Sequence, residues 1–259
     1  MAEDKISAGA ITRDLKTRFV GRRVLYYPVL TSTMEVARQE AERGAAEGTV
    51  VIADEQTAGR GRLKRPWLSP RGNIALSVIL YPDLPRLPQL TMLASLAVAH
   101  SIEATTGLKA AIKWPNDVLV SGKKVSGILL ESNVKGSTAN HAIIGIGINV
   151  NLPPLDFPEI TPTATGLADE LGKKVSRLAV IQRLLVEIEQ LYLTLSAGES
   201  LYEKWRDSLV TLGEKVRVST GDNIYEGVAE SVDRDGSLLV RQADGRLHRF
   251  VAADVTLHG

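Results

Sequence analysis

Apolar residues recur along the chain with two different periods, and these periods separate predicted strands from predicted helices. β-prone apolar runs fill 24–29, 49–54 and 73–81, and the alternation in the third predicts a half-buried strand. Apolar residues at helical spacing fill 90–106 and a longer stretch that begins after Ser176. The pattern therefore predicts a sheet with helices packed against it.

A further helix is expected directly after the first strand. Ser32 is suited to the N-cap and Glu35 to the third helical position, which together form a capping box, and Gly44 is suited to the end of the helix. A second interpretation is that Ser32 and Thr33 contact a ligand, because helix N-termini also favour anions.

Strands dominate the region after residue 107. Four β-prone runs are expected at 110–114, 118–120, 125–131 and 142–150. Gly122 is suited to a tight hairpin turn between the second and third of them. Residues 151–166 are rich in Pro and Thr without periodicity, so they predict a long loop.

The chain changes character after residue 211. Five short β-prone runs, separated by turns rich in Asp and Gly, fill the remaining residues. This pattern is typical of a small SH3-like barrel. We therefore expect an α+β protein with two domains, at 1–211 and 212–259.

Composition and charge exclude several classes of function. The chain has 259 residues with a formal net charge of +1, so it lacks the overall basic field that attracts nucleic acid or membranes. It contains no cysteine, which excludes disulfides, thiolate metal sites and covalent thioesters. Four histidines without cysteine match no zinc spacing, and the sequence leaves the identity of any metal ligand unknown. Without an apolar leader or a run of about eighteen apolar residues, we expect a cytoplasmic protein with no membrane partner.

Residues 59–67, GRGRLKRPW, concentrate four cations and two glycines in a segment that suits neither helix nor strand. Glycines allow backbone N–H groups to converge, and arginines bind carboxylate or phosphate in pairs of hydrogen bonds. The segment predicts a loop that binds a small anion. A loosely binding nucleic-acid segment is the alternative, which the near-neutral charge and the 5% aromatic content disfavour.

Three other segments place polar residues or glycines within the strand region. They are KWPND at 113–117, the pair Lys123-Lys124 before SGILLE, and GIGIN at 145–149. Each has a structural explanation when taken alone: a turn, a solvated hairpin tip and a closely packed strand. GIGIN lacks the third glycine of a dinucleotide fingerprint, and the chain has no GxxxxGK[ST] motif.

Taken together, these segments resemble biotin protein ligases (biotin–acetyl-CoA-carboxylase ligases) in order and spacing, from about Val24 to the C-terminus. GRGR and KWPND are the most specific of them. The resemblance implies a catalytic domain related to class II aminoacyl-tRNA synthetases, with a mixed sheet flanked by helices, followed by an SH3-like domain. It also implies an enzyme that uses ATP, Mg²⁺ and biotin to form biotinyl-5′-AMP. The biotin is then transferred to one lysine of a biotin carboxyl carrier protein.

The resemblance also assigns roles to individual residues. Contacts with biotin or the adenylate are implied for Ser32, Thr33, Met34, Gln56, Gly59, Arg60, Gly61, Arg62, Trp67, Lys124, Gly127 and Asn149. Catalytic roles are implied for Lys124, Asp117, Arg62 and Asn116. Lys124 is expected between the biotin carboxylate and the α-phosphate, where its charge offsets the repulsion of two anions. Asp117 is expected to orient or deprotonate the incoming lysine.

Two residues depart from the family pattern. Lys64 stands where the family commonly has glycine, which would cost on the order of 1 kcal/mol or more if that position needs a positive φ. Met34 stands where asparagine is often found, which removes one polar contact. Two alternatives remain: a lipoate or other acyl ligase on the same scaffold, and a non-catalytic biotin sensor.

Some bacterial members of the family carry an N-terminal helix-turn-helix domain of about sixty residues. Only some twenty residues precede the region of resemblance here, so no DNA partner is expected. Pairing of sheet edges into a homodimer is a further expectation.

Overall fold

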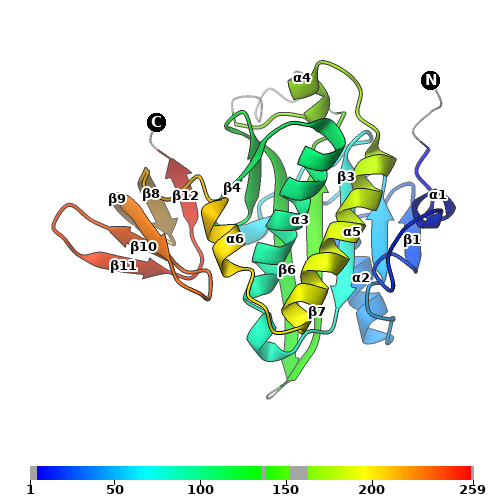
Figure 1. Cartoon of the computed structure of the whole chain (residues 1–259), viewed down its shortest axis with the longest axis horizontal. Helices are drawn as coiled ribbons and strands as arrows, with labels where there is room; N and C mark the ends of the chain where they lie inside the picture. Colours follow the sequence, from blue (N-terminus) through cyan, green and yellow to red (C-terminus); the bar gives the residue numbers. More distant parts are fainter. Residues whose placement is uncertain (1–4, 136–137, 152–162, 258–259) are drawn as a thin grey trace.

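The computed structural model describes residues 5–135, 138–151 and 163–257, which form two sheets and their helices (Figure 1). The strands of the large sheet are β1 (Val24–Tyr27), β2 (Val50–Ala53), β3 (Ile74–Leu80), β4 (Ala110–Lys113), β5 (Asp117–Val120), β6 (Lys123–Lys135) and β7 (Thr138–Ile148). The small sheet consists of β8 (Lys215–Thr220), β9 (Asn223–Val232), β10 (Leu238–Arg241), β11 (Leu247–Phe250) and β12 (Asp254–Leu257). The helices are α1 (Ala8–Thr12), α2 (Thr33–Glu42), α3 (Gln89–Thr106), α4 (Leu167–Leu171), α5 (Arg177–Ser196) and α6 (Tyr202–Asp207).

The large sheet is mixed, with the order β1-β2-β3-β7-β6-β5-β4. Strands β1 and β2 pair in parallel, and the other neighbouring pairs are antiparallel. The small sheet is antiparallel, with the order β11-β10-β9-β8-β12. The expected mixed α+β fold with a C-terminal β region is confirmed. Most of the predicted 151–166 loop lies outside the described residues.

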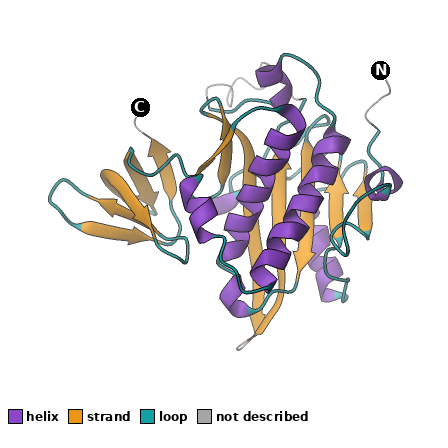
Figure 2. Cartoon of the chain, viewed as in Figure 1, coloured by secondary structure: helices purple, strands orange, loops and turns teal. Residues whose placement is uncertain are grey.

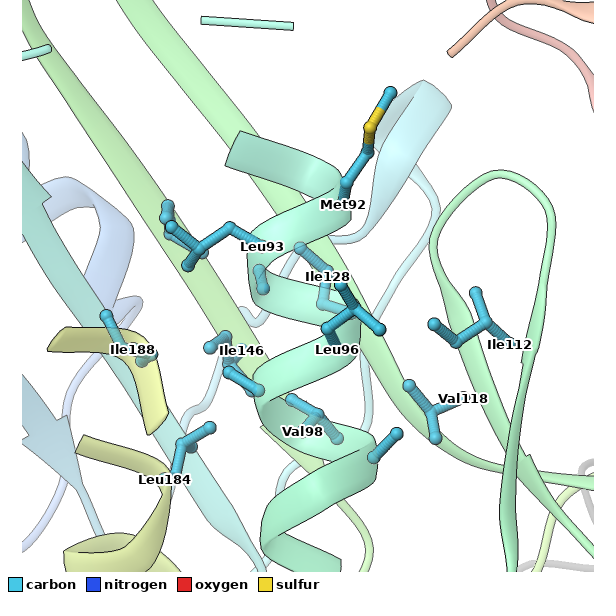
Figure 3. Packing of buried hydrophobic residues seen from close by; sticks show 14 of the residues in the cluster. Met92, Leu93, Leu96, Val98, Ile112, Val118, Ile128, Ile146, Leu184 and Ile188 are labelled. Carbon is cyan, nitrogen blue, oxygen red and sulfur yellow. The ribbon is translucent and has the colours of Figure 1, made fainter. Parts of the chain in front are cut away.

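Helices α3 and α5 lie side by side across one face of the large sheet and form the main core with it (Figure 2). Side chains on a strand alternate between its two faces, so Ile144, Ile146 and Ile148 of β7 all point into this core. Figure 3 shows Ile146 and Ile128 of the neighbouring strand near the α3 residues Leu96 and Val98. The isoleucines of the GIGIN segment therefore build the core, and its glycines face the other side of the sheet.

Helix α2 covers part of that other face. Its residues Met34 and Ala37 pack against Val51, Ile79 and Ile143 from three adjacent strands. As a result β3 is buried along its whole length, so the prediction of a half-buried strand is wrong. The alternation in its sequence separates two apolar environments instead of separating core from water.

The N-terminus of α2 differs from the predicted capping box. Ser32 occupies the N-cap, but its side chain makes no capping hydrogen bond. Glu35 accepts a hydrogen bond from the Thr31 hydroxyl at 3.3 Å instead of pairing with Ser32. The first helical N–H, on Thr33, donates to the side-chain Oε1 of Gln56 at 2.8 Å. A residue from another segment therefore satisfies this helix end, and the Ser32 hydroxyl is not used for capping.

The small sheet docks against the β4 side of the large sheet and α6 (Figure 1). The indole N–H of Trp114 donates to the carbonyl of Gly236 at 2.8 Å, and the hydroxyl of Tyr202 donates to the carbonyl of Val232 at 2.6 Å. None of the described helices is both long and apolar enough to cross a bilayer.

Candidate active site

A cavity of about 440 Å³ opens on the α2 face of the large sheet. This volume lies within the range of small-molecule sites. Its lining comes from the start of α2, the basic loop, the middle strands and the C-terminal domain: 32–34, Gln56, 60–62, 65–67, 113–117, Lys124, 127–129, 145–147, Ser219 and 253–256. Most of the predicted site residues therefore lie around one cavity, although they are far apart in sequence.

The basic loop folds back on itself above this cavity. The N–H of Gly61 donates to the carbonyl of Arg65 at 2.8 Å, and the N–H of Trp67 donates to the carbonyl of Gly59 at 2.9 Å. The left-handed backbone that the structure describes in this loop falls on Leu63, with φ 53°. Leu63 therefore carries the kind of backbone strain that was considered for Lys64, and its side chain is 66% exposed.

Glycines on the sheet make room for Trp67. A Cβ atom on Gly147 would lie closer than 3.0 Å to three atoms of the Trp67 indole, and one on Gly127 would lie 3.1 Å from its Cζ3. Gly145 makes room in the same way for Met34, whose Sδ would lie 2.5 Å from an added Cβ. The space that Met34 occupies thus exists because the facing residue has no side chain.

Lys124 and Asp117 form an ion pair within the cavity, with 2.6 Å between Lys124 Nζ and Asp117 Oδ1. The same ammonium lies 5.5 Å from the centre of the Trp67 ring, a distance suited to a cation–π contact. A bulge in the β5–β6 pairing places Lys124 opposite Leu119, and Asp117 is paired with Gly127. The pair therefore depends on a local irregularity of the hairpin.

Arg62 and Asn116 are joined by a hydrogen bond of 3.0 Å from the guanidinium to the amide oxygen. The amide nitrogen of Asn116 donates to the carbonyl of Ile128 at 2.6 Å, which fixes the direction of its side chain. Burial lowers the pKa of Arg62, and the negative charges of Asp254 and Asp117 oppose that shift. A partly desolvated guanidinium is a strong partner for an anion that enters the cavity.

Several residues of the lining had no role predicted from the sequence. Lys113 is the first residue of KWPND, and burial in the cavity wall lowers its pKa. The C-terminal domain contributes Asp254, which forms an ion pair with Arg65, and Ala253, whose carbonyl accepts a hydrogen bond from Arg62 at 3.4 Å. Lys113 could have been suspected from its motif. No local pattern marks the C-terminal residues, because they reach the site only through the packing of the two domains.

Cations outnumber acids in the lining. Five basic side chains (Arg60, Arg62, Arg65, Lys113 and Lys124) face two carboxylates (Asp117 and Asp254). The excess of three positive charges contrasts with the nearly neutral chain as a whole. Such a cavity favours a ligand with several negative charges.

Two predicted contact residues do not line the cavity. Asn149 lies buried after β7, and its amide donates to the carbonyl of Thr165 at 3.3 Å. Gly59 is the first residue of the loop and is closely packed, since an added Cβ would meet the Trp67 carbonyl at 2.5 Å and Gln56 Nε2 at 3.0 Å. Both positions suit a supporting role in this conformation, and their direct contacts with a ligand stay predictions.

The Arg65–Asp254 pair should help to hold the basic loop against the C-terminal domain. Replacing Asp254 with asparagine should therefore speed tryptic cleavage within 60–64 in the ligand-free protein. The effect should be at most about fivefold, because exposed ion pairs contribute no more than about 1 kcal/mol. Glu55→Gln, which removes the exposed Arg71–Glu55 pair, is the matched control. Equal cleavage rates in the two variants would contradict the holding role.

Comparisons with known proteins agree with this geometry. Residues 26–149 match the Biotin/lipoate A/B protein ligase family, and residues 211–257 match the Biotin protein ligase C terminal domain. The Bifunctional ligase/repressor BirA of Bacillus subtilis is 40% identical over 98% of this chain and 79% of its own length. The biotin--[acetyl-CoA-carboxylase] ligase of Mycobacterium tuberculosis is 33% identical over 87% of this chain and 85% of its own length.

The solved structure of the biotin protein ligase from Aquifex aeolicus in complex with biotin and ATP is also similar. It superimposes with a TM-score of 0.75 at 30% identity, over 92% of this chain and 99% of that one. Similarity in sequence and in structure thus extends over nearly the whole chain, including the second domain. The chain therefore belongs to the biotin protein ligase family.

Proposed function

We propose that the cavity activates biotin with ATP and transfers it to a lysine of a biotin carboxyl carrier protein. The observation that carries this proposal is the position of Lys124. Its ammonium lies against Asp117 and the face of Trp67, above the strand position of Gly127, which has no side chain. Relatives named as biotin ligases, and a solved structure with biotin and ATP bound, support the same assignment.

In the first step, a carboxylate oxygen of biotin attacks the α-phosphorus of ATP. The new O–P bond forms as the bond to the β-phosphate oxygen breaks, and pyrophosphate leaves. Two anions must approach each other, so the reaction needs positive charge at the point of attack. Lys124 provides it there, and Arg62 and Lys113 lie in the same lining.

In the second step, the amine of the carrier lysine attacks the carbonyl carbon of the adenylate, and AMP leaves. Asp117 is bound to Lys124 while no anion is present. When the biotin carboxylate and the phosphate arrive, they become partners of Lys124. The Asp117 carboxylate can then accept a proton from the incoming ammonium, which leaves a nucleophilic amine.

Mg²⁺ is proposed to enter with the triphosphate. It usually keeps water ligands and binds phosphate oxygens with only one or two protein carboxylates. Asp117 and Asp254 are the two carboxylates in the lining, and the described residues contain no cluster of three or more potential ligands. This arrangement fits an Mg²⁺ ion that binds mainly to the nucleotide. The ion would there spread the negative charge of the phosphates.

We also retain the finer structural expectations as proposals. The large sheet is proposed to share the class II aminoacyl-tRNA synthetase arrangement, and the five-stranded C-terminal sheet is proposed to be SH3-like. A boundary near residue 211, a cytoplasmic location and a homodimer that forms through sheet edges stay predictions.

The activity should be directly measurable. The purified chain, incubated with ATP, Mg²⁺, biotin and a carrier domain, should release pyrophosphate and add one biotin to the carrier. A carrier with its acceptor lysine changed to arginine is the control. Parallel reactions with lipoate and octanoate test the alternative of another acyl ligase. Success with lipoate and failure with biotin would overturn the proposal.

A further inference from the structure

Trp114 joins the KWPND segment to the C-terminal region through both of its N–H groups. The backbone N–H donates to the hydroxyl of Thr211 at 2.9 Å, and the indole N–H donates to the carbonyl of Gly236 at 2.8 Å. The side chains of Trp114 and Thr211 are buried, so water does not compete for these bonds. Both bonds therefore connect the cavity wall with residues 211–257, which match the family's C-terminal domain.

The Gly236 carbonyl belongs to a closed turn between β9 and β10. The N–H of Gly236 donates to the carbonyl of Asp233 at 2.8 Å, and the N–H of Asp233 donates to the carbonyl of Ser237 at 2.8 Å. The N–H of Ser237 donates to the Asp235 carboxylate at 3.0 Å. The backbone of Gly236 is left-handed, with φ 88°, and an added Cβ would lie 3.2 Å from Met92 of α3. The turn thus holds its acceptor in one place against the large domain.

The two ends of the KWPND segment are held differently. Asn116 is bonded to Ile128 of β6 in both directions, at 3.0 Å through its carbonyl and at 2.6 Å through its amide nitrogen. Lys113, the last residue of β4, has no comparable support. Within the described residues its ammonium makes no hydrogen bond and no ion pair. The direction of this side chain therefore depends on β4 and on the next residue, Trp114.

We infer that Trp114 is a positioning residue through which the C-terminal domain holds Lys113 toward the phosphates of ATP. The inference rests on the proposed function, in which Lys124 serves the biotin carboxylate and the α-phosphate, and Lys113 is a further cation of the same lining. A cation that is already in place stabilises the leaving pyrophosphate without reorganisation during the reaction. The C-terminal domain would then influence activation through a residue that it holds from outside the cavity.

The first test removes the indole N–H and keeps an aromatic ring. With saturating biotin, Trp114→Phe should lower kcat/KM for ATP in pyrophosphate release about 3- to 10-fold, the usual effect of one lost hydrogen bond. The Kd for biotin alone should not change, because no triphosphate is present in that measurement.

Trp205→Phe is the matched control for this substitution. Trp205 is also buried beside Gly236, but its indole nitrogen has no hydrogen-bond partner. The control therefore loses no hydrogen bond and should retain the kcat/KM of the unmodified chain. Equal kcat/KM values in the Trp114 and Trp205 variants would overturn the inference.

The second test asks whether Trp114 acts through Lys113. In a chain that already carries Lys113→Ala, Trp114→Phe should cause no further fall in kcat/KM for ATP, because the positioned cation is absent. A general loss of packing would lower kcat/KM by the same factor in both backgrounds. Effects that multiply in the double variant would therefore overturn the inference.

A third pair of variants applies even if Trp114→Phe does not fold. Thr211→Val removes the acceptor of the Trp114 backbone N–H and leaves the indole in place. It should lower kcat/KM for ATP by a similar factor, whereas Thr211→Ser keeps a hydroxyl and should retain activity. Equal kcat/KM values in these two variants would contradict the positioning role.

These outcomes are distinct from failure of the proposed function. If the unmodified chain releases no pyrophosphate in response to biotin, the proposed function is wrong. If it does, and the Trp114 variant behaves like the Trp205 variant, only the positioning role of Trp114 is wrong.

Discussion

Replacing Lys124 with alanine should slow formation of the adenylate by about 10²- to 10³-fold, the usual cost of losing one group that stabilises charge in a transition state. Lys124 pairs with Asp117 and lies over the Trp67 ring in the cavity, and its charge is needed most as the carboxylate meets the α-phosphate. Transfer from supplied biotinyl-adenylate should be affected less, because the two anions are then already joined. Biotin-dependent pyrophosphate release and single-turnover transfer measure the two steps separately.

Lys123→Ala is the matched control for this experiment. Lys123 precedes Lys124 in the same hairpin, but it is exposed and does not line the cavity. It should retain nearly full activity in both steps. An equal loss in both steps for the Lys124 variant would refute a role specific to activation and would favour a structural role for the Lys124–Asp117 pair.

Adding one methyl group at Gly147 should displace Trp67 and severely weaken ligand binding. The new Cβ would lie closer than 3.0 Å to three atoms of a rigid indole, which cannot give way without moving the loop. Overpacking of this kind costs about 1–3 kcal/mol. A calorimetric titration with biotin should show the loss of affinity. Thermal unfolding should show whether the sheet itself remains intact.

Gly145→Ala provides the comparison on the same strand. Its Cβ would meet the flexible end of Met34, whose side chain can change rotamer. We therefore expect a clearly smaller loss of biotin binding than for Gly147→Ala. If both variants bind biotin equally well or equally poorly, the contact between Trp67 and the sheet does not control the site.

Much of the fold follows from local pattern. The alternation of isoleucine and glycine in 145–148 places apolar side chains in one layer and open space in the other, and both are present in the structure. The helix at 90–106 and the five C-terminal strands follow in the same way from periodicity and from turn residues. The composition of the 59–67 loop predicted an anion-binding segment, and the loop contributes three of the five cations in the lining.

Other features depend on tertiary packing, so local pattern could not reveal them. Ser32 was suited to a cap, but Gln56 from another segment satisfies the first helical N–H. The left-handed backbone of the loop falls on Leu63, a residue type that does not mark such a position in a sequence, within a turn closed by hydrogen bonds between residues several positions apart. Asp254 enters the cavity through a contact with a loop about 190 residues earlier in the chain.

The shared wall of the cavity limits how members of this family can exchange parts. The C-terminal sheet closes the cavity with Asp254, and the Gly236 carbonyl also accepts a hydrogen bond from Trp114 of the KWPND segment. A chimaera that takes residues 211–257 from a relative would need a partner for Arg65 and an acceptor for Trp114 at the same places. The small domain, the loop and the KWPND segment therefore share one wall of the site, and a chimaera that preserves both contacts should keep that wall intact.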